Sequence, residues 1–247
     1  MPDDGKVLRC DRLAVPAVRN GPPVKRRQHR AASTGRQVPD LQHERSAQSA
    51  GFLRIAGIDE AGRGPWAGPV IAAAVVLEPS ALPATLRDGL DDSKRLSRQR
   101  RERLFAVLTD CTAVRFGVGK AEVAEIDDLN ILGATMLAMQ RAVAELPGGC
   151  DLALVDGNRP PALSCAVRCV VGGDGLSLSI AAASIVAKVT RDRLMAELDV
   201  IHPGYGWSRN AGYGTAEHQR ALATLGVTCH HRRSFAPILK ILSQGRS

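Results

Sequence analysis

Two hydrophobic patterns alternate along the chain from residue 53 onward, and they predict interleaved strands and helices. Five short runs are continuously apolar or apolar at every second position, which is typical of β-strands. They are LRIAGID, VIAAAVVL, TAVRFGVGKA, LALVD and VRCVVGGD, starting at residues 53, 70, 112, 152 and 167. Because VIAAAVVL contains no polar position, we expect this strand to be fully buried.

Helical spacing fills the segments between these runs. Apolar residues that recur every three or four positions predict helices over 97–110, 122–128, 130–146, 177–201 and 215–226. Ser97 and Thr215 are suitable N-caps, Gly226 is a suitable C-terminal residue, and Pro203 closes the long helix. Strands followed by interleaved helices and strands imply an α/β layer architecture with a mixed sheet.

Residues 1–50 lack this periodicity. They carry ten Lys and Arg residues against five Asp and Glu, and they are rich in Pro, Gln and Ser. So few apolar residues cannot bury enough surface to offset the entropy of ordering. We therefore expect a disordered basic N-terminal tail over 1–50 and one domain over 51–247, with C-terminal helices from about residue 203. The tail either adds salt-sensitive affinity for nucleic acid, is a solvated extension, or comes from a start codon assigned too early.

Composition narrows the class of protein. A chain of 247 residues with 45% hydrophobic and 23% charged residues is typical of a soluble globular protein with a full core. No apolar run approaches the ~20 residues that cross a bilayer, and the N-terminus lacks the apolar region of a secretory signal, so we expect a cytoplasmic protein. The six cysteines show no spacing typical of a zinc site. In the run from Cys229 to His231, the adjacent histidines point in different directions, so we predict no metal site there.

Acidic residues stand at the ends of three predicted strands. Asp59 and Glu60 end the first, Asp156 ends the fourth, and Asp174 ends the fifth. Functional sites of open α/β sheets are built at strand ends. Four carboxylates in one place repel each other and require cations or protons. Hard divalent ions with oxygen ligands, Mg²⁺ above all, meet this requirement, and two of them can activate water and stabilise the leaving oxygen of a phosphodiester.

Structural interpretations compete for each of these acids. Asp174 could cap the helix that starts near Ser177, and Asp156 could shape the turn that follows it. Asp59 and Glu60 fit a structural role less well, because consecutive strand residues face opposite sides and one of them must point into the core.

Seven motifs in this chain resemble those of bacterial ribonuclease HII, a type 2 ribonuclease H. In chain order they are GIDEAGRGPWAGPV, DDSKRLS, EIDDLNILGATMLAMQRAV, VDGNRPP, IAAASIVAKVTRDRLM, HPGYGW with GYGT, and HHRRSF. The resemblance covers the chain from about residue 53 to 240, which is the whole part predicted to fold. The resemblance implies a ribonuclease H-like fold, in which helices flank a five-stranded mixed sheet and a small helical region follows at the C-terminus.

The resemblance also implies an activity. Such enzymes are endonucleases that use Mg²⁺ or Mn²⁺ to hydrolyse RNA in RNA–DNA hybrids, and they cut especially at single ribonucleotides within duplex DNA. Cleavage lies 5′ to the ribonucleotide and leaves a 3′-hydroxyl and a 5′-phosphate. By motif position, the acidic metal-site residues of the family correspond to Asp59, Glu60, Asp156 and Asp174. They are the same four acids that the strand ends select, and we expect two ions with substrate bound.

Substrate contacts follow from the same motifs. Gly62, Arg63 and Gly64 resemble the family's GRG loop, whose backbone approaches the 2′-OH of the ribonucleotide. Tyr213 matches a tyrosine that packs on the next deoxyribose and thereby selects the junction. We also expect phosphate contacts from Lys94 and Ser184. Each of these residues also has a structural alternative. The glycines could form a simple tight turn, Tyr213 could pack in the core, and Lys94 could be a solvated lysine.

One departure and several alternatives remain open at this stage. Asn210 and Ala211 replace the family's common His-Lys, so a cationic phosphate contact is missing, and Arg209 is a candidate substitute. A Ser184–Lys188 nucleophilic pair and a Lys188–Asp192 helix pair are further interpretations. A non-catalytic hybrid-binding protein and an integrase-like nuclease are the alternative functions. We expect a monomer, and no motif, including the C-terminal ILSQGRS, decides whether a sliding clamp is a partner.

Overall fold

A mixed five-stranded sheet forms the centre of the protein in the computed structural model, which describes residues 38–244. The sheet order is β3-β2-β1-β4-β5, with antiparallel pairing of β1 with β2 and of β2 with β3, and parallel pairing of β1 with β4 and of β4 with β5. The strands are β1 (Ile55–Ala61), β2 (Val70–Leu77), β3 (Val114–Ala121), β4 (Leu152–Asp156) and β5 (Ala166–Val170). The predicted α/β class and the mixed sheet of five strands are confirmed.

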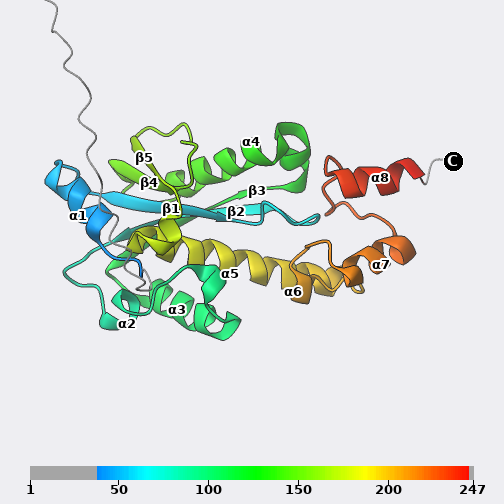
Figure 1. Ribbon diagram of the computed structural model, residues 1–247, viewed down its shortest axis with the longest axis horizontal. Coiled ribbons are helices and arrows are strands. Elements are labelled where there is room, and N and C mark those ends of the chain that lie inside the picture. The colour runs from blue at the N-terminus through cyan, green and yellow to red at the C-terminus, as the bar shows by residue number, and fades with distance from the viewer. Residues whose placement is uncertain (1–37, 245–247) are drawn as a thin grey trace, which may run out of the picture. The chain divides into compact units, whose positions relative to one another are not determined.

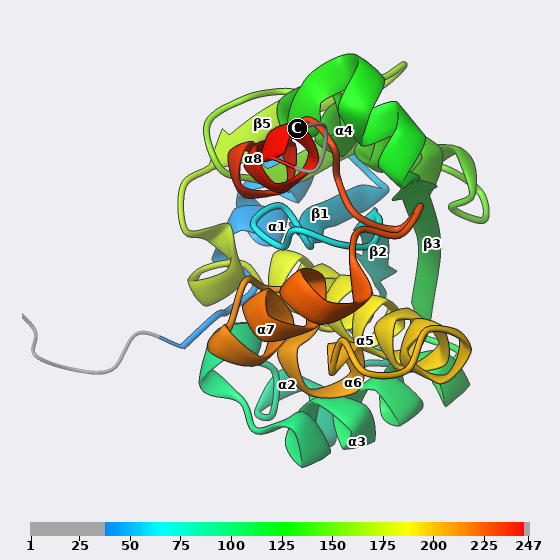
Figure 2. The ribbon, with the colours of Figure 1, turned by 90° about the vertical axis from the view of Figure 1, so that its right-hand side faces the viewer.

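Helices cover both faces of the sheet (Figure 1). They are α1 (Gln42–Ser49), α2 (Ala84–Arg87), α3 (Arg98–Asp110), α4 (Val123–Ala144), α5 (Leu178–Ile201), α6 (Trp207–Asn210), α7 (Ala216–Leu225) and α8 (Ala236–Gln244), with 3₁₀ turns η1 (Ser93–Arg95) and η2 (Gly173–Gly175). Figure 2 shows the layers in the order α4, sheet, α5 and α3. The predicted helix caps at Ser97 and Thr215 each accept a backbone hydrogen bond, from Arg100 and His218 respectively.

Small residues let the two long helices approach the sheet closely. A Cβ at Gly57 of β1 would collide with the backbone of α5 at Ser179. On the opposite face, Cβ atoms at Gly117 and Gly119 of β3 would collide with backbone carbonyls of α4. All eight residues of β2 are buried between these layers, as VIAAAVVL predicts. The close packing fixes α5 directly beneath the end of β1.

Helix α4 contains the interruption that the sequence predicts between residues 128 and 130. Asn130 has φ 60° and ψ 168°, which lie outside the helical region. Its side-chain oxygen accepts hydrogen bonds from the backbone nitrogens of Leu132 and Gly133, so it caps the second half of the helix. The two predicted helices are therefore joined across one capped break.

The predicted boundary of the N-terminal tail at residue 50 is wrong. Residues 42–49 form α1, whose Glu44 is only 4% exposed. Its Oε1 accepts hydrogen bonds from the hydroxyls of Ser177 and Ser179, both at 2.6 Å, and from the Ser179 nitrogen at 3.0 Å. This buried carboxylate holds the polar helix to the start of α5, and the buried side chains of Leu41 and Ala47 pack in the core beside it. Residues 1–37 of the predicted tail lie outside the described residues.

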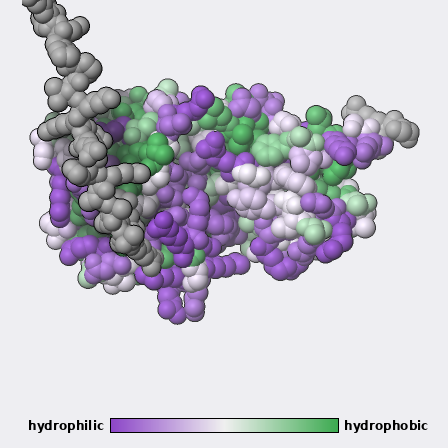
Figure 3. Space-filling model, in the orientation of Figure 1, coloured by the Kyte–Doolittle hydropathy of each residue, from purple (hydrophilic) through white to green (hydrophobic). Residues whose placement is uncertain are grey.

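The surface shown in Figure 3 is mostly hydrophilic, and hydrophilic side chains separate its apolar patches. Large exposed apolar residues come from different elements of the described chain, including Leu53, Leu129, Val171 and Leu239. Among residues 38–244, no helix is both long and apolar enough to cross a membrane.

Candidate active site

Three carboxylates meet at the edge of the sheet where the parallel strands β1, β4 and β5 end. They belong to Asp59 in β1, Asp156 at the end of β4 and Asp174 in η2, and one oxygen from each lies within 4.8 Å of the others. The Asp156 carboxylate accepts a hydrogen bond of 2.7 Å from the nitrogen of Gly173, which draws η2 toward β4. Asp174 lies in this 3₁₀ turn and not at the end of a strand, because β5 already ends at Val170.

Helix capping does not explain Asp174. The N-cap of α5 is Ser177, whose hydroxyl accepts the backbone N–H of Ile180 at 3.3 Å. The Asp174 carboxylate instead accepts a hydrogen bond of 3.1 Å from the Lys94 ammonium. Asp174 is nevertheless 6% exposed, so its carboxylate is buried beside the other two.

The side chains of Asp59 and Glu60 point in different directions, as those of consecutive strand residues do. Asp59 is buried, and its carboxylate is hydrogen-bonded to Ser184 of α5. Glu60 is half-buried and pairs with Arg63 at 3.1 Å. Both residues line the same cavity, but the Glu60 carboxylate lies outside the group of three.

Burial and mutual repulsion disfavour the charged state of these acids. Burial raises the pKa of Asp59 well above its ordinary value, and the charges of Glu60 and Asp156 raise it further. Burial also raises the pKa of Glu60, partly offset by the hydrogen bond from Arg63. The pKa of Asp156 is raised by burial and by Asp174, against the opposing hydrogen bond from Gly173. A divalent cation removes this repulsion, and carboxylate oxygens are the ligands that Mg²⁺ and Mn²⁺ prefer, so the donor set fits such an ion.

Lys94 and Ser184 lie in the same cavity. Burial lowers the pKa of the Lys94 ammonium, but the hydrogen bond to Asp174 and the negative charges of Asp174 and Asp59 together outweigh this effect, and the net pKa is raised. Ser184 is hydrogen-bonded to Ser93 at 2.8 Å as well as to Asp59. Lys188 pairs with Asp192, as the i,i+4 interpretation predicts, and it makes no hydrogen bond to Ser184 within residues 38–244. The geometry therefore gives no support to a Ser–Lys nucleophilic pair.

The glycine-rich loop forms one wall of this cavity, which has a volume of about 290 Å³. The lining comprises Asp59, Glu60, Ala61, Gly62, Arg63, Gly64, Ser93, Lys94, Asp156, Ser184, Lys188, Arg191 and Tyr213. Gly62 has φ +100°, and a Cβ there would collide with the Arg191 guanidinium. A second hollow, of about 950 Å³, lies beside α1 and Arg87, but the acidic cluster is not part of it.

Two buried arginines hold this loop, and the sequence patterns did not single them out. Arg191 of α5 donates to the carbonyls of Ala67, Pro69 and Ala211. Arg232 donates to the carbonyl of Gly62 at 2.6 Å and to that of Arg63 at 3.1 Å.

Both guanidiniums are charged at neutral pH although they are buried. Burial lowers the pKa of Arg191 to about 10 and that of Arg232 to about 9. Their charge is satisfied by the backbone carbonyls of the loop, which require donors because they are buried.

The aromatic residues near this loop divide into two groups. Tyr213 is 49% exposed, lines the cavity and lies against Gly64, where a Cβ would come within 3.3 Å of the ring. Tyr205 and Trp207 are buried and stack on each other with ring centroids 4.9 Å apart. Tyr205 and Trp207 therefore belong to the core.

Asn210, which stands on the loop where the family commonly has a cationic phosphate contact, has a structural role. Its amide donates to the carbonyl of Tyr205 at 2.7 Å, and its oxygen accepts from the nitrogen of Gly212 at 2.8 Å. Ala211 follows with φ 49°. Arg209, the candidate substitute, forms an ion pair with Glu217. The loop before Tyr213 is thus fixed by amide hydrogen bonds.

A family model described as Ribonuclease HII matches residues 56–238. The chain belongs to the ribonuclease HII family. Ribonuclease HII of Paramagnetospirillum magneticum is 63% identical over 188 residues, which cover 76% of this chain and 92% of that relative. The resemblance that the seven motifs carry is confirmed. Family membership makes this chain a metal-dependent endoribonuclease that acts on RNA–DNA hybrids.

Solved structures of similar proteins share the fold. The ribonuclease H2 of Pyrococcus horikoshii OT3 superposes with a TM-score of 0.67 and 28% identity, covering 79% of this chain and 100% of that one. A complex of PCNA with RNase HII from Archaeoglobus fulgidus matches with a TM-score of 0.58 and 27% identity, covering 73% of this chain and 94% of that chain. The ribonuclease H-like fold that the motifs imply is confirmed.

Proposed function

We propose that Asp59, Glu60, Asp156 and Asp174 hold the catalytic ions that cleave duplex DNA 5′ to an embedded ribonucleotide. The single observation that carries the proposal is the meeting of three carboxylates within 4.8 Å, two of which, Asp59 and Asp156, line a cavity whose other wall is the Gly62–Gly64 loop. This arrangement juxtaposes a cation site with a backbone segment that can approach a sugar hydroxyl. The products are a 3′-hydroxyl and a 5′-phosphate.

The acids differ in the role that we assign to them. Asp59, Glu60 and Asp156 hold the ion at the scissile phosphate, and Asp174 contributes to a second position. Bound Mg²⁺ or Mn²⁺ supplies activation of water and stabilisation of the leaving oxygen. Glu60 must separate from Arg63 to take this role, which releases the exposed Arg63 guanidinium for a phosphate group. Most of the catalysis is then positioning and charge neutralisation.

Recognition of the ribonucleotide falls to the loop and to Tyr213. The 2′-OH both donates and accepts hydrogen bonds, and the backbone at residues 62–64 offers both kinds of partner. Arg232 holds this backbone at Gly62 and Arg63, and Arg191 holds the following part of the loop at Ala67. The exposed ring of Tyr213 packs on the following deoxyribose, where a second 2′-OH would clash. Lys94 and Ser184 contact phosphate.

We infer that one copy of the chain suffices, because residues of a single chain supply every side chain of this site. We also infer a cytoplasmic location, because bacterial duplex DNA, the proposed substrate, lies in the cytoplasm. The Archaeoglobus fulgidus complex supports PCNA-type clamps as candidate partners. At the C-terminus, where ILSQGRS stands, the described residues end at Gln244.

The test compares three duplexes: one with a single ribonucleotide, one of DNA alone and one RNA–DNA hybrid. Each is incubated with Mg²⁺, Mn²⁺ or EDTA, and the ends of the products are mapped. We expect a metal-dependent nick 5′ to the ribonucleotide and none in plain DNA. Cleavage of both DNA duplexes would favour an integrase-like nuclease. Binding without cleavage would favour a hybrid-binding protein.

A further inference from the structure

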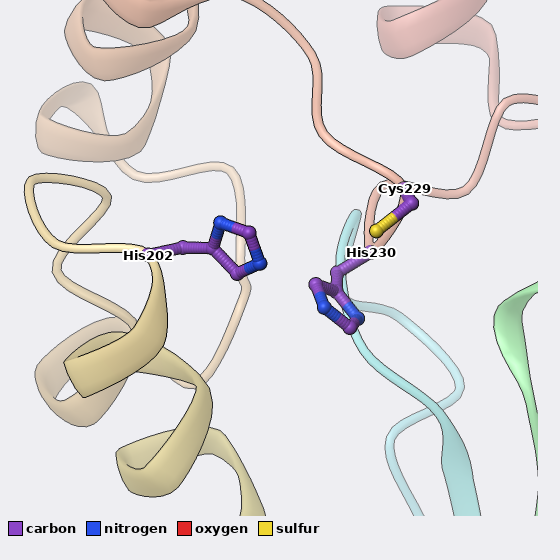
Figure 4. Close-up of side chains that lie close together, drawn as sticks. All are labelled: His202, Cys229 and His230. Atoms are coloured by element: carbon purple, nitrogen blue, oxygen red, sulfur yellow. The ribbon is translucent and has the colours of Figure 1, made fainter.

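A second group of metal-ligating side chains lies apart from the carboxylates. His202 follows the end of α5, and Cys229 and His230 belong to the loop before α8. One ligand atom from each lies within 4.8 Å of the other two. Figure 4 shows the two imidazoles and the thiol directed toward one another from these two segments. The histidines are half-buried and Cys229 is exposed, so the group is open to solvent.

His218 and His231 lie next to this group and have a purely structural role. The Nδ1 of His218 bonds to the carbonyl of Tyr213 at 3.0 Å, and its Nε2 accepts from Trp207 and lies 3.0 Å from Nε2 of His231. The Nδ1 of His231 accepts from the nitrogen of Thr228. Every ring nitrogen of this pair has a partner, and the partners require His218 to be protonated on Nδ1 and His231 on Nε2.

His202 and His230 differ from that pair. Their ring centroids are 4.9 Å apart, yet neither ring makes a hydrogen bond to protein within residues 38–244. The expectation that His230 and His231 diverge is correct. Because they diverge, His230 meets His202, which lies 28 positions earlier in the sequence, and this juxtaposition has no signal in the run from Cys229 to His231. Within residues 38–244, the two half-buried imidazoles make no hydrogen bond through their ring nitrogens, and they lie beside a thiol. Their nitrogen lone pairs and the thiol sulfur are therefore free to bind a metal ion.

We propose that His202, Cys229 and His230 bind a borderline divalent ion of the Zn²⁺ class. Two imidazoles and a thiolate suit Zn²⁺ or Co²⁺ and not Mg²⁺, whereas the all-oxygen carboxylate site has the opposite preference. Zn–N bonds of about 2.0 to 2.1 Å and a Zn–S bond of about 2.3 Å place tetrahedral donor atoms about 3.3 to 3.6 Å apart, so small side-chain rotations bring donors that lie within 4.8 Å of one another to this spacing. Cys229 releases its proton to solvent on binding, and water takes the fourth position.

Occupation of this site would connect the end of α5 to the loop that carries Arg232. Arg232 follows His230 by two residues and holds the carbonyls of Gly62 and Arg63. The ion therefore stabilises the C-terminal segment on which the glycine loop depends. This inference does not rest on the proposed cleavage chemistry, because its tests do not measure cleavage.

The first test uses Co²⁺ absorption on the full chain, stripped with EDTA and kept reduced with a phosphine. We expect one equivalent of Co²⁺ to give a thiolate charge-transfer band and the strong visible bands of tetrahedral cobalt. The charge-transfer band should persist in Cys169→Ser, a control at a half-buried thiol outside this group, and disappear in Cys229→Ser. Absence of the band in the wild type, or its persistence in Cys229→Ser, would overturn the proposal.

A second test needs no cysteine variant. Zn²⁺ added in the presence of saturating Mg²⁺ should raise the melting temperature by about 5 °C, and His202→Ala should lose this rise while keeping the rise caused by Mg²⁺.

In the wild type, Zn²⁺ should also slow alkylation of Cys229 at least about tenfold, as followed by mass spectrometry, without slowing that of Cys169. Equal alkylation rates with and without Zn²⁺, or a full Zn²⁺ effect in His202→Ala, would contradict the proposal.

Discussion

The guanidinium of Arg232 donates to the carbonyl oxygen of Gly62, with a distance of 2.6 Å between Nη2 and O. This contact joins the C-terminal part of the chain to the loop that we assign to ribonucleotide recognition. Arg232 is fully buried, and its remaining donors reach the carbonyls of Arg63, Gly68 and Pro69. A single planar side chain therefore fixes most of the turn.

The Arg232 contacts predict a loss of activity when the guanidinium group is replaced. Arg232→Lys cannot bond to several carbonyls at once, so the loop shifts, and a displacement of about 1 Å can reduce a rate about 10²-fold. We expect kcat/KM on the single-ribonucleotide duplex to fall about 10- to 100-fold. The neighbouring Arg233 is exposed, and Arg233→Lys is the matched control. Unchanged kinetics in a folded Arg232→Lys protein would contradict the positioning role.

Metal-free protein should lose stability as the pH rises above the ordinary carboxyl range. The pKa of Asp59 is raised in the folded state, so between its unfolded and folded values the native state binds more protons than the unfolded state. The stabilisation is full below the unfolded pKa of about 4 and is lost as the pH rises through the raised folded value. The same sign applies to Glu60 and Asp156.

Melting temperatures in EDTA and in excess Mg²⁺, measured from about pH 5 to about pH 8, test this dependence. We expect the gain from Mg²⁺ to increase with pH, because the ion replaces the bound protons. The gain should shrink in Asp59→Asn and stay unchanged in Asp110→Asn, whose acid is exposed at the end of α3. A gain that is independent of pH would contradict the raised pKa values.

Tyr213 should control the preference for junctions and contribute little to stability, since its ring is half exposed. Tyr213→Ala removes the surface that we propose packs on the deoxyribose. We expect cleavage of the single-ribonucleotide duplex to fall about tenfold or more relative to a continuous RNA–DNA hybrid, a change of about 1.4 kcal/mol in transition-state stabilisation. Tyr213→Phe keeps the ring and should keep the preference. Equal losses on both substrates in Tyr213→Ala would show that the ring does not select junctions.

Glu44 should stabilise the fold although it lies in the segment whose sequence indicates disorder. Glu44→Ala leaves the hydroxyls of Ser177 and Ser179 without their acceptor in a buried position. We expect the free energy of unfolding to fall by about 2 to 3 kcal/mol in denaturant titrations. Gln48→Ala, at an exposed position of the same helix, should change it by less than about 0.5 kcal/mol. Equal effects of the two substitutions would show that α1 is not held by Glu44.

The five strands along the chain and the acids at their ends could be predicted because both depend on local patterns. Asp59 and Asp156 follow apolar runs, and parallel strands bring such ends to one edge of the sheet. Arg191 and Arg232 could not be predicted in this way. Both occur in polar sequence contexts that resemble a solvated surface, and only the folded loop supplies the carbonyls that keep them buried.

Helix α1 was missed for a similar reason. Its sequence QHERSAQS contains no apolar stripe, and the partners of Glu44 lie more than 130 positions away. The 3₁₀ turn around Asp174 was extended into a strand because Val170 and Val171 continue the apolar run. In both cases long-range hydrogen bonds outweigh the local pattern.

The most direct test of the metal-site assignment is cleavage of the single-ribonucleotide duplex by Asp59→Asn under single-turnover conditions with Mg²⁺. Asn keeps the size and the hydrogen-bond acceptor of Asp59 but removes the charge that holds the ion. We expect the cleavage rate to fall about 10³-fold or more, while the melting temperature in EDTA is equal to or above that of the wild type. Asp110→Asn should cleave normally. Retained cleavage by folded Asp59→Asn would contradict the assignment of the carboxylates as the catalytic metal site.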